Sequence, residues 1–163
     1  MSEASNDHPD VVVFPPLVPL AILVIAVALQ RFVPLNMLAA LTPTPRIVAG
    51  ALIAAAGLII VISAQRTLAR RGTNMNPSQP TIAIATDGIY RSTRNPMYVG
   101  GMIALAGIAL IFALDWLMAL MIPAAFVLHY GIVRHEEQYL VRKFGDEYQT
   151  YMASAPRYLP FIG

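Results

Sequence analysis

Four stretches of the chain are long, apolar and almost free of charge, and they constrain the fold more than any other feature. They cover about residues 14–32, 47–64, 98–114 and 116–132. About 20 apolar residues in a helix cross the roughly 30 Å hydrocarbon layer of a bilayer. Because 57% of the 163 residues are hydrophobic and only 12% are charged, a soluble core of this size could not bury them all. We therefore expect an all-α integral membrane bundle of about four transmembrane helices, forming one membrane domain over residues 1–163.

The boundaries of these runs carry local signals. A proline-rich turn at residues 41–45 is expected to separate the first two helices, and Asp115 alone divides the third from the fourth, which predicts a tight helical hairpin. Gly50, Ala54 and Gly57 in the second run predict close contact with a neighbouring helix, since small residues let backbones approach.

The basic residues indicate how the bundle is oriented. Five arginines lie in the polar segment 65–96 and four more Lys or Arg follow residue 132, leaving only Arg31 and Arg46 elsewhere. With four spans, this loop, the tail and both termini share one side, and an excess of Lys and Arg marks the cytoplasmic side. The first ten residues hold no Lys or Arg, unlike a signal peptide, so we expect the first run to be retained as a span.

The tail after the fourth run is expected to form an interfacial C-terminal helix. Leu140, Phe144, Tyr148 and Tyr151 recur at spacings of four, four and three, which places them on one helical face. An amphipathic helix of this kind lies along a membrane surface.

Several classes of function are excluded or disfavoured. The formal charge of +2 is spread between apolar runs without a basic stripe, so we expect no nucleic-acid partner. The chain has no cysteine, which excludes a disulfide framework and a thiolate metal site. His129 and His135 are six residues apart and match no zinc signature, so no metal is expected.

The predicted topology brings two polar segments, 86–100 and 135–160, to the same membrane face. The second begins with a carboxylate pair, Glu136 and Glu137, within a turn of a span. Such a pair is costly to desolvate and needs a cationic partner or a function, and Arg94 is a candidate partner.

The same two segments contain an ordered set of motifs: Thr86-Asp87-Gly88-Ile89-Tyr90, Arg94-Asn95-Pro96-Met97-Tyr98-Val99-Gly100, Glu136-Glu137 with Leu140, Phe144-Gly145-Asp146-Glu147-Tyr148, Tyr151 and Arg157-Tyr158-Leu159-Pro160. In this order and spacing they resemble the isoprenylcysteine carboxyl methyltransferases and the related phospholipid methyltransferases. The resemblance covers residues 80–163, the half that is expected to bind the cofactor. The Arg-Asn-Pro form resembles bacterial members, which implies a bacterial inner membrane protein.

The resemblance implies methyl transfer from S-adenosyl-L-methionine to a membrane-soluble acceptor at the cytoplasmic face. The residues that it implies for the cofactor are Ile82, Ala83, Ile84, Ala85, Tyr90, Asn95, Pro96, Met97, Tyr98 and Glu136. Arg94 is expected to order an acid or the substrate, and Glu137 to act as a base where the nucleophile must lose a proton. The physical chemistry is compatible, since a sulfonium suits a carboxylate and aromatic faces.

The acceptor and some alternatives stay open. Ile132 stands where the prenylcysteine enzymes carry an arginine for the substrate carboxylate, so a lipophilic thiol, amine, phenol or other acid is open as the acceptor. Arg94 also fits an interface arginine that binds lipid phosphate, Glu136 and Glu137 fit a solvated helix face, and the tyrosines fit an aromatic belt. A membrane reductase with a nicotinamide cofactor and a non-enzymatic helical subunit are the alternative functions, and the oligomeric state is undetermined.

Overall fold

The computed structural model describes residues 14–73 and 80–159, and this part of the chain is helical. The elements are α1 (Leu17–Phe32), α2 (Pro43–Arg70), η1 (Gly88–Arg91), α3 (Pro96–Phe112), α4 (Asp115–Leu128), η2 (His129–Val133), α5 (Arg134–Phe144) and α6 (Asp146–Ser154). The all-α prediction is confirmed. The N-terminal segment before residue 14 and Pro160 of the last motif lie outside the described residues.

The four apolar helices lie where the four runs predicted them, with two differences in extent. The second begins at Pro43 and ends at Arg70, because Pro43 occupies the first turn, where a missing amide donor costs little. The predicted turn at residues 41–45 is therefore partly helical. The fourth continues through one π-helical stretch, η2, into α5 as a single helix, Asp115–Phe144.

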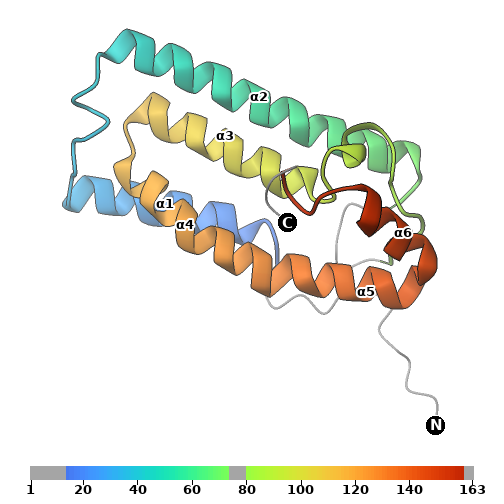
Figure 1. Ribbon diagram of the computed structural model, residues 1–163. Coiled ribbons are helices and arrows are strands. Elements are labelled where there is room, and N and C mark those ends of the chain that lie inside the picture. The colour runs from blue at the N-terminus through green and yellow to red at the C-terminus, as the bar shows by residue number, and fades with distance from the viewer. Residues whose placement is uncertain (1–13, 74–79, 160–163) are drawn as a thin grey trace.

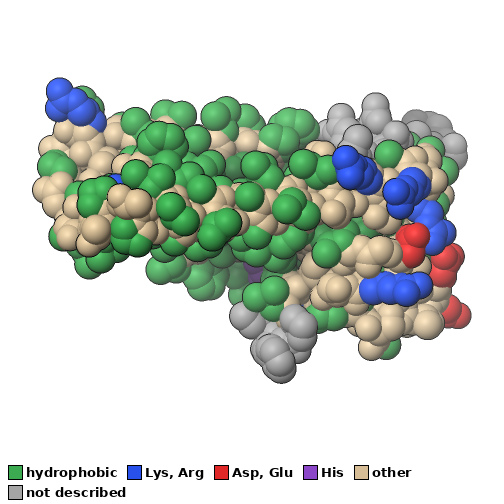
Figure 2. All heavy atoms as spheres, turned by 90° about the horizontal axis from the view of Figure 1, so that it is seen from above, with side chains coloured by type: hydrophobic (Ala, Val, Ile, Leu, Met, Phe, Trp, Pro, Cys, Tyr) green, Lys and Arg blue, Asp and Glu red, His purple; other side chains and the backbone are tan. Residues whose placement is uncertain are grey.

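Two of these helices are long and apolar enough to cross a membrane. They are Pro43–Arg70 and Asp115–Phe144, while Leu17–Phe32 and Pro96–Phe112 are shorter apolar helices. On the face shown in Figure 2, hydrophobic side chains cover most of the length of the molecule, and charged side chains gather at one end. These lengths and compositions are those expected of a membrane protein, and the crossing of all four helices stays a prediction.

The bundle is built from two helix pairs, with α2 against α3 and α1 against α4 (Figure 1). Glycines make the first pair unusually close: a Cβ atom added to Gly57 would lie 2.5 Å from the carbonyl oxygen of Gly100, and one added to Gly50 would lie 2.8 Å from that of Gly107. The close contact predicted from the small residues of the second run is confirmed. The pair positions the start of α3, where the candidate site begins.

The end of the bundle opposite the polar loop is closed by hydrogen bonds. Asp115, at the start of α4, accepts from the amide of Leu38 at 2.8 Å and from Gln30 Nε2 at 3.4 Å. Trp116 Nε1 donates to the Val33 carbonyl at 2.7 Å. α3 ends at Phe112 and α4 begins at Asp115, so the predicted tight hairpin is present.

The polar tail is not the single amphipathic helix that its spacing predicted. Gly145 has φ +52°, in the left-handed region that favours glycine, and it separates α5 from α6. The chain turns there, yet Leu140, Phe144, Tyr148 and Tyr151 still pack into one cluster. That cluster also holds Ala64 of α2, Ile84 of the loop and Tyr90 of η1, so the tail folds back onto the end of the bundle (Figure 1).

Candidate functional site

The residues that precede α3 are tied directly to the end of the tail. The amide of Arg94 donates to the Pro156 carbonyl at 2.9 Å, and the Thr93 hydroxyl and the Asn95 side-chain amide both donate to the Arg157 carbonyl at 3.1 Å. Thr93 and Asn95 are buried. The contact between the two polar segments, which topology predicted, is therefore present and runs through motif residues on both sides.

A buried cluster of charges lies beneath this junction. Arg94 donates from Nε and Nη2 to Oε1 of Glu137 at 3.1 and 2.9 Å, and Arg157 donates from Nε and Nη2 to Oε2 at 2.9 and 2.8 Å. The Arg94 and Glu137 side chains are only 7% and 8% exposed. Arg94 Nη1 also donates to the carbonyl oxygens of Met152 and Ala155 at 3.0 and 2.5 Å. Both oxygens of Glu137 are thus held by guanidinium groups, and its hydrogen bond raises the pKa of Arg157.

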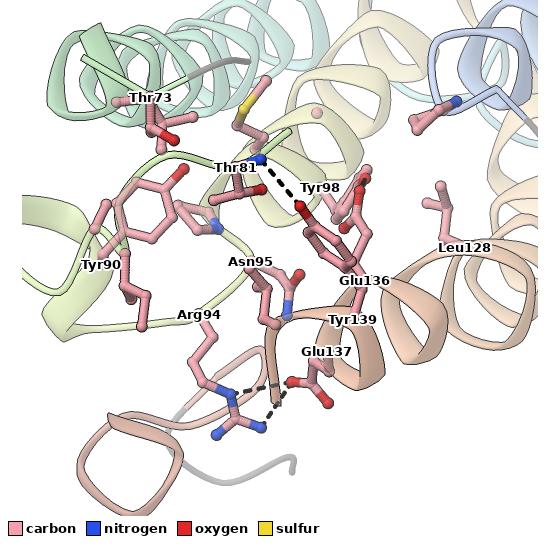
Figure 3. A pocket seen from close by; sticks show the side chains of 18 of the residues that line it. Thr73, Thr81, Tyr90, Arg94, Asn95, Tyr98, Leu128, Glu136, Glu137 and Tyr139 are labelled. Atoms are coloured by element: carbon pink, nitrogen blue, oxygen red, sulfur yellow. Dashed lines mark hydrogen bonds and ion pairs between the residues drawn. The ribbon is translucent and has the colours of Figure 1, made fainter. Parts of the chain in front are cut away.

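The neighbouring acid has a different environment. Glu136 is half-buried and accepts one hydrogen bond, from the Tyr98 hydroxyl at 2.9 Å. No ion pair reaches it from the described residues. Consecutive residues of a helix point about 100° apart, which turns Glu137 toward the tail and Glu136 toward the start of α3 (Figure 3). Glu136 is therefore a carboxylate with little compensation for its charge.

The loop that precedes η1 is held across the top of the site by two side chains. Thr73 Oγ1, at the end of α2, accepts from the amides of Ile82 and Ala83 at 3.1 and 3.4 Å. On the other side, the amide of Thr81 donates to the Tyr139 hydroxyl of α5 at 3.2 Å (Figure 3). The loop thus bridges α2 and α5.

Aromatic residues form a third wall. The Tyr151 hydroxyl donates to the backbone carbonyl of Tyr90 at 2.7 Å, and Tyr148 packs edge-on against Tyr151. Burial raises the pKa of Tyr90, and the nearby Tyr151 and Glu136 raise it further. Burial likewise raises the pKa of Tyr148 and of Tyr151. These phenols stay neutral at physiological pH and offer polar hydroxyls and ring faces.

These walls enclose a cavity of about 350 Å³. One part is polar and is lined by Thr73, Thr81, Tyr90, Asn95 and Glu136. The other part is apolar and is lined by the first turns of α1, by α3 and by α4, with Val18, Pro19, Ile22, Met102, Leu105 and Leu128. In the view of Figure 3, Glu136 and Tyr98 lie between Tyr90 and Leu128, which places the carboxylate between the two parts.

The structure brings together nearly all of the residues that the sequence singled out. The cavity is lined by Ala83, Ile84, Ala85, Tyr90, Arg94, Asn95, Pro96, Met97, Tyr98, Glu136 and Glu137. Ile82 is the exception, because its side chain is 65% exposed and only its amide is held, by Thr73.

Other lining residues were not singled out as site residues. Tyr148 and Tyr151 were expected on a surface helix, and the apolar residues of α1 were expected only to span the membrane. Thr73 and Tyr139 have no sequence signal, since their role depends on a loop that folds over the cavity.

Comparison with known proteins covers most of the residues that line the cavity. A family model described as phospholipid methyltransferase matches residues 45–147, from the start of α2 to the start of α6. The chain is similar to the Protein-S-isoprenylcysteine O-methyltransferase of Schizosaccharomyces pombe (strain 972 / ATCC 24843), with 35% identity over 82 residues. These residues are 48% of this chain and 34% of the relative, so the chain spans about a third of the length of the curated relative that it matches. No solved structure matches the chain significantly.

Proposed function

The chain belongs to the phospholipid methyltransferase family, and from this premise we propose that it transfers a methyl group from S-adenosyl-L-methionine to a lipophilic acceptor at the cytoplasmic face of a membrane. The family and the curated relative support methyl transfer in general. The acceptor, the side of the membrane and the residues that act are our proposals.

The single observation that carries the proposal is the environment of Glu136. It is a carboxylate that lines the cavity, with the Tyr98 hydroxyl as its hydrogen-bond donor among the described residues. A carboxylate without a cation in a largely apolar cavity is costly, and a ligand that brings a positive charge removes much of that cost. The sulfonium of S-adenosyl-L-methionine is such a ligand.

The remaining groups fit the rest of the cofactor. Tyr90 and Tyr98 offer aromatic faces for an adenine ring or a cation, and the side chains of Asn95 and Thr81 offer polar groups for ribose hydroxyls or the amino acid part. The cavity volume of about 350 Å³ lies within the range of small-molecule sites. We propose that these residues hold the cofactor, with Ala83, Ile84 and Ala85 of the loop covering it.

The charge of the cavity argues against a nicotinamide dinucleotide. Such a cofactor carries at least two phosphate charges, which need cationic or amide donors. Arg94 is the one basic residue among the described residues that line the cavity, and its guanidinium is engaged by Glu137, Met152 and Ala155. The cavity therefore favours a cationic cofactor over a polyanionic one.

The bound cofactor supplies an electrophilic methyl group, and the protein has to bring a nucleophile to it in a place without bulk water. We propose that the apolar part of the cavity, between α1, α3 and α4, receives the acceptor from the lipid phase. Arg94 and Glu137 then act as positioning residues, since Glu137 has no free oxygen with which to take a proton. They hold the junction from which Asn95 and Tyr98 reach the cavity.

Binding of the two forms of the cofactor to the purified full-length chain tests the proposal. S-adenosyl-L-methionine is a cation at sulfur and S-adenosylhomocysteine is not. Glu136→Gln is therefore expected to weaken binding of the first by at least about tenfold more than binding of the second, because the variant loses the attraction between the carboxylate and the sulfonium. Glu147→Gln, at an exposed position of α6, is the matched control and should change neither affinity. Absence of binding by wild type, or equal losses for the two ligands, would overturn the proposal.

A further inference from the structure

A second hollow lies outside the cavity, in the groove between α5 and residues 152–157. Its volume is about 410 Å³, and Glu137 is the residue that it shares with the cavity. Its other lining residues are Arg134, Gln138, Val141, Arg142, Met152 and Arg157. We call this hollow the arginine groove.

The arginine groove has an excess of positive charge. Three arginines line it against one carboxylate, and that carboxylate is already bonded to Arg157 and to Arg94. Gln138 and Arg142 form no hydrogen bond or ion pair within residues 14–73 and 80–159, and Arg134 only stacks over the ring of Tyr130, at 5.7 Å. The groove therefore presents unused donors and about two uncompensated charges, which favour an anion.

One face of the long helix leads from the arginine groove along the apolar side of the molecule. Arg134, Gln138 and Arg142 are four residues apart on α5 and so lie in one row. On α4 and η2 the row continues through Tyr130 and Phe126, whose rings stack with centroids 6.4 Å apart and are 54% and 61% exposed. A molecule with an apolar chain and a negative head can lie along this row with its head in the groove.

We propose that the arginine groove binds the phosphate of an anionic membrane phospholipid, whose acyl chain lies against Phe126 and Tyr130. Guanidinium groups match phosphate oxygens in a bidentate manner, and Gln138 adds a neutral donor. Because the arginine groove is continuous with the apolar row of Tyr130 and Phe126, a lipid fits this surface better than soluble phosphate does. This site is separate from the cavity proposed for the cofactor and does not depend on the reaction proposed there.

The test uses the full-length chain in phosphatidylcholine vesicles with spin-labelled phosphatidylglycerol or phosphatidylcholine, and measures the relative association of the two labels by electron paramagnetic resonance. The variant is Arg134→Gln with Arg142→Gln, and the matched control is Arg66→Gln with Arg70→Gln on exposed α2. Because Arg134 and Arg142 converge on one groove and Arg66 and Arg70 do not line it, the groove variant should lower the preference for phosphatidylglycerol by at least about fivefold. The control should keep most of it.

The outcomes separate the sources of the anion. Equal losses in the groove variant and in the control would overturn the proposal, because the preference would then reflect the overall charge of the polar end. Loss of the preference in wild type on addition of millimolar inorganic phosphate would also overturn it in favour of a soluble anion. The groove variant should bind S-adenosylhomocysteine with unchanged affinity, which distinguishes failure of this proposal from failure of the proposed function. If the variant loses that affinity, the lipid preference of Arg142→Gln alone is compared with the control by the same criteria.

Discussion

Replacing Arg94 by glutamine tests whether the buried charges of the site stabilise its architecture or take part in the reaction. Arg94 makes two hydrogen bonds to Glu137 and one each to the carbonyl groups of Met152 and Ala155. Its loss leaves these two carbonyl groups without that donor and leaves Glu137 with Arg157 as its partner. Both members of the pair are nearly buried, so water replaces little of what is lost.

The expected magnitude follows from these contacts. Hydrogen bonds to a charged group contribute about 1.5–3 kcal/mol each, and the desolvation of a buried guanidinium offsets much of their sum. Removal of one partner of a buried ion pair typically costs about 3–5 kcal/mol. Arg94→Gln should therefore lower the free energy of unfolding by about 3–5 kcal/mol, while Arg91→Gln, at an exposed position of the same segment, should change it by less than about 0.5 kcal/mol.

Denaturation in detergent micelles, followed by circular dichroism, measures this difference, and calorimetry with S-adenosylhomocysteine measures the site. A double-mutant cycle with Glu137→Gln should show coupling of about 1–3 kcal/mol, since the two residues share two hydrogen bonds. The reasoning fails if Arg94→Gln and Glu137→Gln unfold like wild type while methyl transfer is lost. That result would make Glu137 a base that acts on the acceptor.

Three further changes test other parts of the structure. Gly57→Ala should destabilise the chain by about 1–3 kcal/mol in the same denaturation assay, because the new methyl group meets the backbone of α3. In the control Gly101→Ala on α3, the new methyl group meets nothing within 4 Å, and the free energy of unfolding should rise by up to about 1 kcal/mol. Equal effects of the two changes would contradict the close packing of α2 against α3. Tyr139→Phe removes the acceptor for the Thr81 amide and should weaken S-adenosylhomocysteine binding roughly two- to tenfold by calorimetry, and unchanged affinity would show that the loop is held by other contacts. Asp115→Ala should lower the free energy of unfolding by about 1–3 kcal/mol and leave the ligand affinity of the folded protein unchanged, so a loss of affinity would show that the far end of the bundle communicates with the site.

The four helices could be predicted from the sequence because an apolar run in a bilayer has few other ways to satisfy the hydrogen-bonding groups of its backbone. The hairpin at Asp115 and the close contact at Gly50 and Gly57 were also predictable, since a single charge and a set of small residues are local signals. The length of the second helix was not, because Pro43 indicates either a turn or a first helical turn and the sequence does not distinguish them.

The tail shows the limit of periodicity more clearly. The spacing of Leu140, Phe144, Tyr148 and Tyr151 predicted one surface helix, and the left-handed backbone at Gly145 divides it. The four side chains still pack together, so the pattern indicated a shared cluster correctly but gave the wrong geometry. The cluster covers the cavity with Tyr148 and Tyr151, a role that no local pattern could indicate because it depends on the chain folding back.

The roles of the two adjacent acids also depend on how the chain folds. The family resemblance assigned Glu136 to the cofactor and Glu137 to a base, but neither residue type nor position showed which of the two is the partner of Arg94. In the structure Glu137 is neutralised by two arginines that also hold residues 93–95 against 156–157. Glu136 instead has the Tyr98 hydroxyl as its hydrogen-bond donor, in a cavity that no free cation of the described residues enters. Because one acid is used to close the site, the other can be left uncompensated without the bundle opening to hydrate it. The stability of the Glu137 cluster is thus what permits a carboxyl group without an ion pair at Glu136, and a cationic ligand is the partner that we propose for it.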